Sequence, residues 1–218
     1  MKLVNIKGHP RDSVIMIGER IENVGKYIPV ARPIIITDTN VLACWGRHFP
    51  PADVIAIGAG EKIKTFDTVG YIYEQLLKIE ADRASFIIGI GGGIVCDIAG
   101  FVASTYMRGV RFGFVSSTLL SQVDASVGGK NGFNFGGYKN IVGVFSQPEF
   151  VICDLNLLKT VSPKEILSGF AEIIKHGAIA DKGLFAYLEE NRDHALALDS
   201  TVIEKLVYDS VIIKSEIV

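Results

Sequence analysis

The sequence predicts an α/β protein in which a doubly wound parallel sheet is followed by the start of an all-helical domain. Short runs rich in Ile and Val recur along the first two-thirds of the 218-residue chain. Stretches with helical periodicity separate these runs, and the strand-like runs stop after Asp154. Strands that alternate with helices form parallel sheets covered on both faces. We therefore expect an α/β domain over residues 1–160 and part of a helical domain over residues 161–218.

The expected strands are short and apolar on both faces, as strands between two layers of helices are. They are residues 14–17, 34–37, 54–57, 86–90, 112–115 and 150–153. The clearest helices among them are residues 65–81 and 94–106. Because the carboxyl ends of parallel strands share one edge of a sheet, we expect the polar turns that follow these strands to meet there.

Helix signals dominate the last quarter of the chain. Ser162 is a capping residue and Pro163 suits the first position of a helix over residues 163–179. Further helices are expected at residues 183–190 and 201–218. No Gly, Asn or Pro ends the last of them, so we expect the chain to be cut inside a helical domain.

The composition argues against several function classes. With a formal net charge of −2 and 21% charged residues, the chain lacks the basic footprint of a nucleic-acid-binding protein. No segment approaches the roughly 20 apolar residues of a membrane helix, and the first residues lack the apolar run of a signal peptide. Cys44, Cys96 and Cys153 are far apart and indicate reduced thiols. We expect a cytoplasmic protein that acts on a small molecule.

Residues 124–140, DASVGGKNGFNFGGYKN, form the most distinctive segment of the chain. Glycine lets the backbone approach a ligand closely and adopt angles closed to other residues. Lys130 and Lys139 are expected to bring positive charge to the same place. The segment therefore predicts a glycine-rich loop that binds a phosphorylated, hydroxyl-rich small molecule.

A second glycine-rich segment, residues 89–93, follows an expected strand and opens a helix. The N–H groups at the start of a helix can bind phosphate. The spacing differs from the dinucleotide fingerprint because residue 94 is Ile, and glycines in such turns also serve packing alone. We favour nucleotide or phosphate binding. Asp97, one turn into the helix, is either a charge near the helix start or an acceptor for sugar hydroxyls.

Polar turns also follow three other expected strands. Asp38 either holds ribose hydroxyls or caps the next helix, and the two interpretations have equal weight. Residues 60–64, Gly-Glu-Lys-Ile-Lys, form the next turn. Ser117 and Thr118 follow a further strand, where hydroxyls contact a cofactor or cap a helix. Arg108 precedes that strand and, taken alone, is a surface arginine.

Glu172, Lys175 and His176 are spaced so that they project from one face of the helix expected at residues 163–179. The simpler interpretation is a solvated stripe on an amphipathic helix. Gly169 lies on the same face, where glycine costs about 1 kcal/mol relative to alanine, and we interpret it as room for a ligand. A carboxylate here can be one ligand of a metal that needs two or three more, but the remaining histidines have no spacing that would supply them.

Four longer segments stand in a specific order along the chain: GIGGGIVCDIAGFVASTYMRG, SSTLLSQVDASVGGKNGFNFGGYKN, VGVFSQPEFVICDLNLLKT and GFAEIIKHG. Together they resemble the dehydroquinate synthase family of sugar phosphate cyclases, over most of residues 54–177. The resemblance implies NAD bound to a Rossmann-like domain. The implied cofactor contacts are Asp38, Asn40, Gly60, Glu61, Lys64, Gly92, Gly93, Ile94, Val95, Asp97, Ser117, Thr118, Lys130, Lys139, Lys159 and Thr160.

The same resemblance implies a substrate site and a metal. The implied substrate contacts are Arg108, Asp124, Lys130, Lys139, Asn140, Lys175 and Lys214. Glu172 would be one of three ligands of a divalent metal, zinc or cobalt. The other two ligands of the family are histidines in a segment that would follow Val218, so we expect little or no turnover by the 218 residues alone. Cys96 and Ser117 stand where the family usually has Gly and Thr.

The implied reaction converts the seven-carbon sugar acid phosphate DAHP into 3-dehydroquinate and phosphate, in the shikimate pathway to aromatic amino acids. Hydride moves to NAD⁺, phosphate leaves by elimination, the hydride returns, the ring opens and an internal aldol closes the carbocycle. We expect a homodimer. Two alternatives stay open: a cyclase that acts on a different sugar phosphate, and a nucleotide-binding module without catalysis.

Overall fold

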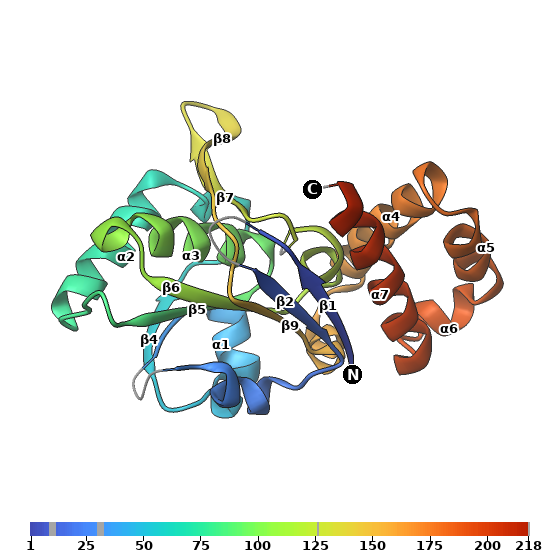
Figure 1. Cartoon of the computed structure of the whole chain (residues 1–218), viewed down its shortest axis with the longest axis horizontal. Helices are drawn as coiled ribbons and strands as arrows, with labels where there is room; N and C mark the ends of the chain where they lie inside the picture. Colours follow the sequence, from blue (N-terminus) through green and yellow to red (C-terminus); the bar gives the residue numbers. More distant parts are fainter. Residues whose placement is uncertain (9–11, 30–32, 126, 218) are drawn as a thin grey trace.

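A seven-stranded sheet forms the centre of the molecule (Figure 1). The computed structural model describes residues 1–8, 12–29, 33–125 and 127–217. The strand order is β1-β2-β9-β6-β5-β3-β4, and every neighbouring pair is parallel except β1 with β2. The strands are β1 Lys2–Ile6, β2 Ser13–Ile17, β3 Ile34–Asp38, β4 Asp53–Ile57, β5 Phe86–Gly91, β6 Arg111–Ser116 and β9 Phe150–Cys153. The expected α/β class and all six expected strands are confirmed, whereas β1 was not expected.

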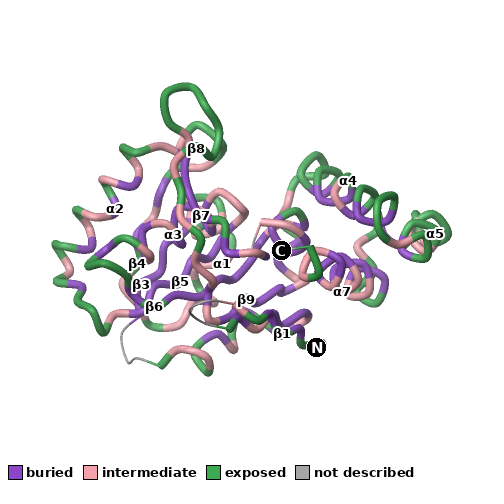
Figure 2. Tube along the Cα trace, turned by 45° about the horizontal axis from the view of Figure 1, so that its top comes forward, coloured by how far each residue is buried: buried purple, intermediate pink, exposed green. Residues whose placement is uncertain are grey.

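Side chains of the central strands alternate between two apolar cores, one on each face of the sheet. Ile34 and Ile36 of β3 belong to one core, and Ile35 between them belongs to the other. Helices α2 (Phe66–Lys78) and α3 (Gly93–Thr105) cover the first face. The second face is covered by α1 and a 3₁₀ helix, η1. This double burial explains why the strands are apolar throughout, and Figure 2 shows them mostly buried.

Shorter helical segments complete the first part of the chain. They are η1 Ile21–Tyr27, α1 Thr39–Trp45, η2 Gly46–His48, η3 Glu61–Ile63, η4 Tyr106–Arg108, η5 Ser121–Ala125 and η6 Leu155–Thr160. Of these, η5 is a single turn of π-helix. It joins β6 to the hairpin that follows, and both α4 and α7 pack against it.

Four helices form a separate layer beside the β1 edge of the sheet (Figure 1): α4 Pro163–Ile179, α5 Lys182–Glu190, α6 Arg192–Leu196 and α7 Ser200–Ile217. Ser162 Oγ caps α4 by accepting the N–H of Glu165 at 3.3 Å, as expected. The three expected helices are confirmed within one residue, although Val218 lies outside the described residues, and α6 is additional. Helix α7 packs against β1 and β2. In the part of the chain that the structure describes, no helix is long and apolar enough to cross a membrane.

The glycine-rich segment is not the expected loop. Most of it belongs to an antiparallel hairpin of β7 (Lys130–Phe135) and β8 (Tyr138–Phe145), which projects from the sheet (Figure 1). Gly136 and Gly137 form its turn with φ of 60° and 84°, a geometry that favours glycine. Lys130 pairs with Phe145 at the base, whereas Lys139 lies next to the turn. In the register, Lys139 lies four to five residues of β7 beyond Lys130, which is roughly 15 Å at 3.3 Å per residue, so the structure does not bring the two charges to one place as expected.

Candidate functional site

The expected polar turns meet at the carboxyl-terminal edge of the sheet. In the parallel register, Asp38 at the end of β3 lies opposite Ile57 at the end of β4. Gly91 at the end of β5 lies opposite Ser116 at the end of β6. The structure therefore brings to one edge the turns that contain Asp38 and Asn40; Gly60, Glu61 and Lys64; Gly92, Gly93, Ile94 and Val95; and Ser117 and Thr118.

Asp38 caps α1 through its side chain. Its Oδ1 accepts the backbone N–H groups of Asn40 and Val41, both at 2.9 Å. The capping interpretation is therefore confirmed. A second role toward a ribose stays a prediction.

Two of the glycines at the start of α3 are required by the packing of the protein itself. A Cβ on Gly91 would lie 2.6 Å from Cβ of Val95, and a Cβ on Gly93 would lie 2.9 Å from Cβ of Ala125. Gly92 begins the helix without a side-chain capping bond, and Thr118 lies against it. Since a helix leaves its first N–H groups without intrahelical partners, this uncapped end suits a phosphate group.

Lys64 connects the turn of residues 60–64 to α3 and to the hairpin. It is only 5% exposed, and its Nζ donates to a carboxylate oxygen of Asp97 and to Oδ1 of Asn140, the latter at 2.5 Å. Burial raises the pKa of Asp97 to about 6, although the Lys64 ammonium acts in the opposite direction. Two predicted cofactor residues and one predicted substrate residue therefore form a single polar group around the buried Lys64 ammonium.

Asn134, which sequence reasoning missed, ties the hairpin to the same turn. Its backbone N–H donates to the Lys64 carbonyl at 2.9 Å, and its Nδ2 donates to Glu61 Oε1 at 2.8 Å. The bond from Asn134 lowers the pKa of Glu61. Asn134 Oδ1 also accepts the N–H of Asn140 at 2.9 Å, where φ is +52°. Lys139 lies here too, with Nζ 3.5 Å from Glu61 Oε1. Lys139 is thus placed toward the turn of residues 60–64 and away from Lys130.

A cavity of about 440 Å³ lies between the hairpin, α3, η5 and α7. Among its lining residues are Asp97, Asp124, Lys130, Asn140 and Lys214. Lys214 reaches it from α7, and its Nζ donates to Asp124 Oδ1 at 2.5 Å. Residues from both parts of the chain therefore line one cavity that contains carboxylates, an amide and ammonium groups.

Asp124 also belongs to a cluster of metal-ligand type. Asp124, Glu172 and His176 each offer one ligand atom, and these atoms lie within 4.8 Å of one another. His176 Nε2 is 3.2 Å from Glu172 Oε1, while Nδ1 is buried without a hydrogen-bond partner among the described residues. Burial lowers the pKa of His176, which favours the neutral imidazole that binds metals. Two carboxylates and an imidazole are ligands that zinc and cobalt accept, so these residues fit such an ion.

The position of His176 corrects the interpretation of helix α4. With 1% exposure, His176 is part of the buried side of α4 and does not lie on a solvated stripe. Gly169 also makes no room for a ligand, because its Cβ would lie 2.6 Å from Leu119 Cβ and 2.9 Å from the Leu120 nitrogen. Glycine at this point lets α4 approach the segment before η5. That approach brings Glu172 close to Asp124.

Each carboxylate of the cluster also holds a lysine. Lys175, one turn after Glu172 on α4, contacts the same oxygen of Glu172 that lies near His176. Lys214 holds Asp124. The structure thus brings Asp124, Glu172, Lys175 and Lys214 together, as four of the predicted site residues.

Three predicted residues lie apart from this group. Arg108 is exposed in η4, beyond the far end of α3, and the eight residues of α3 from Asp97 to Thr105 alone span about 12 Å. Thr160 Oγ1 accepts a bond of 2.9 Å from Trp45 Nε1, near the end of α1. Lys159 donates to Asn156 Oδ1 at 2.9 Å. Their roles stay predictions, and the structure gives Arg108 no place in the cavity of this chain.

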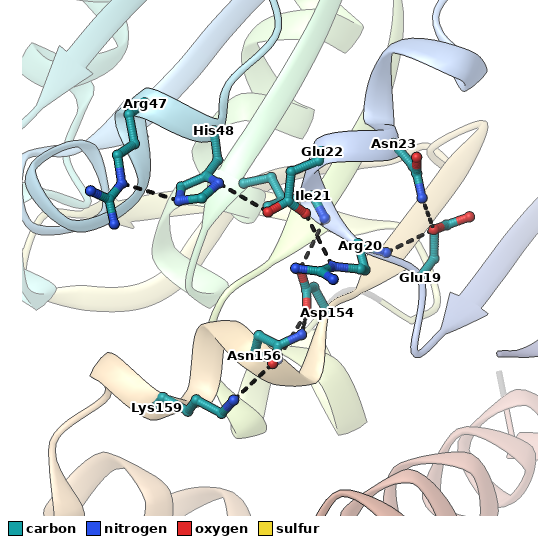
Figure 3. A network of polar contacts seen from close by, with 10 residues as sticks. All are labelled: Glu19, Arg20, Ile21, Glu22, Asn23, Arg47, His48, Asp154, Asn156 and Lys159. Carbon is teal, nitrogen blue, oxygen red and sulfur yellow. Dashed lines mark hydrogen bonds and ion pairs between the residues drawn. The ribbon is translucent and has the colours of Figure 1, made fainter.

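The surroundings of Lys159 form a polar network between η6 and η1 (Figure 3). Asp154 accepts the Asn156 N–H at 2.9 Å through one oxygen and the Ile21 N–H at 2.9 Å through the other. Because Asp154 is almost fully buried, these bonds fix the start of η6 beside η1. Lys159 is therefore held at a defined place next to the sheet edge.

Comparison with known proteins gives matches that include the residues of the cavity and of the Asp124–Glu172–His176 cluster. A family model described as 3-dehydroquinate synthase N-terminal matches residues 54–168, and one described as 3-dehydroquinate synthase C-terminal matches residues 169–218. The 3-dehydroquinate synthase of Alkaliphilus metalliredigens is 42% identical over 205 residues, which are 91% of this chain and 58% of that protein. That of Acetivibrio thermocellus is 37% identical over 227 residues, which are 99% of this chain and 63% of that protein.

Solved structures share the fold. A 2-deoxy-scyllo-inosose synthase complexed with carbaglucose-6-phosphate, NAD⁺ and Co²⁺ has a TM-score of 0.83 at 25% identity, covering 98% of this chain and 62% of that one. ValA, the 2-epi-5-epi-valiolone synthase from Streptomyces hygroscopicus with NAD⁺ and Zn²⁺ bound, has a TM-score of 0.85 at 24% identity, covering 99% and 63%. This chain thus spans less than two-thirds of the length of each of these four proteins.

Proposed function

The chain belongs to the 3-dehydroquinate synthase family, and from this premise we propose that the gene product containing it converts DAHP into 3-dehydroquinate and phosphate, using NAD and a divalent metal. The observation that carries the proposal is the junction at Asp124. This residue lines the 440 Å³ cavity and also belongs to the cluster with Glu172 and His176. A substrate in the cavity would therefore lie next to a metal held at Glu172.

NAD would lie along the carboxyl-terminal edge of the sheet. The uncapped start of α3 at Gly92 would receive its pyrophosphate, and Asp38 would face a ribose. Glu61 and Lys64 would border the nicotinamide end, because Lys64 already contacts Asn140 of the substrate cavity. The cofactor and the substrate would thus share the Lys64 group.

The side chains that line the cavity would bind and orient the substrate and stabilise its developing charge. When bound, NAD⁺ supplies hydride acceptance and return, and the metal at Glu172 supplies polarisation of a substrate hydroxyl. Lys130, at the base of the hairpin, and Lys214 would hold the phosphate or carboxylate of the substrate. Asp124 and Asn140 would accept or donate hydrogen bonds to hydroxyls and so orient the ring. The lysines would stabilise the negative charge that develops as phosphate leaves.

The alternative of a cyclase that acts on a different sugar phosphate can be separated from the proposal by its substrate. The two solved structures are synthases of 2-deoxy-scyllo-inosose and of 2-epi-5-epi-valiolone, and at 24–25% identity they document a common fold. The curated relatives at 37% and 42% identity are 3-dehydroquinate synthases, which favours DAHP. A panel of sugar phosphates assayed for phosphate release would separate these possibilities. We also propose that the protein is a cytoplasmic homodimer, and its mass in solution would test the dimer.

The cofactor half of the proposal is testable on the 218 residues. Trp45 is the only tryptophan, and its contact with Thr160 places it beside the edge where NAD would bind. We expect NAD⁺ to change its fluorescence saturably and Lys64→Met to weaken binding, because Lys64 orders the cofactor turn. Lys62→Met, an exposed neighbour, is the matched control. Absence of binding at millimolar NAD⁺, confirmed by calorimetry, would refute this half.

Catalysis by the 218 residues themselves is expected to be slight. By family resemblance, the complete metal site has two further histidines outside them. We propose that phosphate release from DAHP by this chain stays near background even with NAD⁺ and Co²⁺. Release at a rate comparable with a full-length family member would contradict this view.

A further inference from the structure

Gln122 is a buried amide in η5 that bonds to two separate segments of the chain. Its Nε2 donates to the carbonyl oxygen of Ser116 at 3.0 Å, where β6 ends, and to that of Asp154 at 3.1 Å, where η6 begins. Gln122 is 0% exposed. Both neighbouring atoms are acceptors, so the amide nitrogen is the atom that faces them. One side chain thereby joins η5 to the carboxyl-terminal edge of the sheet.

We propose that Gln122 is a positioning residue: it fixes η5 on the sheet, so that Asp124 faces the substrate cavity at a constant distance from the start of α3. Asp124 lines the cavity, whereas Gln122 is not among its lining residues. Gln122 would therefore act through Asp124. The inference deepens the proposed function, on which it rests for the role of Asp124 toward a substrate hydroxyl.

The local backbone makes Asp124 depend on Gln122. Residues 121–125 form a single turn of π-helix, a rare geometry that is frequent at functional sites. The N–H of Gln122 donates to the Thr118 carbonyl at 3.0 Å, and the carbonyl of Asp124 accepts the N–H of Val127 at 3.0 Å. Asp124 lies two residues after Gln122 in this one turn. A shift of the Gln122 backbone would therefore move Asp124 as well.

The surroundings of η5 show why its position matters. Helices α4 and α7 pack against η5 from the helical layer. On the other side, a Cβ on Gly93 would lie 2.9 Å from Cβ of Ala125, so η5 also lies against the start of α3. The position of η5 therefore sets the distance between Asp124 and the place where we propose that NAD binds.

The chemistry of Gln122 favours this role over a purely packing role. Burying an amide costs free energy that only its hydrogen bonds offset, so an apolar side chain of similar size would serve a packing position as well. Methionine has a similar length and volume but no donor. The two bonds from Nε2 are what Gln122 adds, and they connect η5 to two neighbouring strand ends.

Hydrogen exchange of the 218 residues tests this role without NAD or substrate. In Gln122→Met we expect the amides of residues 121–125 to exchange about 10-fold faster or more, because two hydrogen bonds that hold η5 are lost. Tyr27→Phe is the matched control: it removes a bond to the buried Glu19 on the opposite face of the sheet and should not change exchange over residues 121–125.

Gln122→Asn is the second variant, because asparagine is too short to reach both carbonyl oxygens. It should act in the same direction and serves if Gln122→Met does not fold. Exchange over residues 121–125 that equals the wild type in a folded Gln122 variant would overturn the proposal.

Kinetics of the complete gene product separate positioning from a loss of stability. With DAHP, Gln122→Met should lower kcat about 10-fold or more and leave KM for NAD⁺ within about 2-fold, because misplacing a group by about 1 Å is enough to slow the reaction. The cofactor turn is held independently, since the N–H of Ser117 donates to the Gly91 carbonyl at 2.9 Å. Tyr27→Phe should change neither constant.

An unchanged kcat in Gln122→Met, or an equal fall in Tyr27→Phe, would contradict the positioning role. Wild-type protein that releases no phosphate from DAHP would instead refute the proposed function. Hydrogen exchange would in that case still decide whether Gln122 fixes η5.

Discussion

Replacing Gly169 by alanine tests whether a glycine positions the helix that carries Glu172. Alanine in a helix interior gains about 1 kcal/mol over glycine. At position 169 the added Cβ would lie 2.6 Å from Leu119 Cβ and 2.9 Å from a backbone nitrogen of Leu120. Overpacking of this kind costs about 1 to 3 kcal/mol. Gly169→Ala should therefore lower the free energy of unfolding by about 0 to 2 kcal/mol.

Gly70→Ala provides the matched control, because Gly70 lies inside α2 and no atom approaches its added Cβ within 4 Å. It should raise the free energy of unfolding by about 1 kcal/mol. Urea unfolding of both variants measures the difference, which we expect to be about 1 to 3 kcal/mol. Gly169→Ala should also bind Co²⁺ more weakly, since α4 must move from Asp124. If the two variants were equally stabilised, the packing argument would be refuted.

Two further predictions concern the Lys64 group. Because the pKa of Asp97 is raised to about 6 in the fold, the folded state holds this proton more tightly than the unfolded chain. Between pH 7 and pH 5 the wild type should therefore gain about 1 kcal/mol of stability relative to Asp97→Asn, as measured by urea unfolding; a pH-independent difference would contradict this. Asn134→Ala removes hydrogen bonds to Glu61 and Asn140. It should weaken NAD⁺ binding several-fold in the Trp45 fluorescence assay. Asn191→Ala, in the helical layer, is the control and should leave NAD⁺ binding unchanged.

The strands and the start of α4 follow from local chemistry and were predictable. Runs such as Ile34, Ile35 and Ile36 must be buried on alternating faces, and Ser162-Pro163 specifies a helix start wherever it stands. The same holds for the polar turns, because parallel strands place their carboxyl ends on one edge.

The hairpin and the Asp124–Glu172–His176 cluster were not predictable in the same way. Glycines in β7 and β8 hide the alternation that marks a strand, although the Gly136-Gly137 turn was a signal for a hairpin. Periodicity alone placed His176 beside Glu172 on a solvated face; the segment that buries it comes from elsewhere in the chain. The contact of Lys214 with Asp124 joins residues 90 positions apart, and no local pattern encodes it.

The most direct test of the account is phosphate release from DAHP by the complete gene product that contains this chain. Glu172→Gln removes the carboxylate that we assign to the metal, and Glu165→Gln, on the exposed first turn of α4, is its control. We predict release that requires a divalent metal and only catalytic amounts of NAD⁺, unchanged by Glu165→Gln and abolished by Glu172→Gln. Metal-dependent release that survives Glu172→Gln would contradict the account.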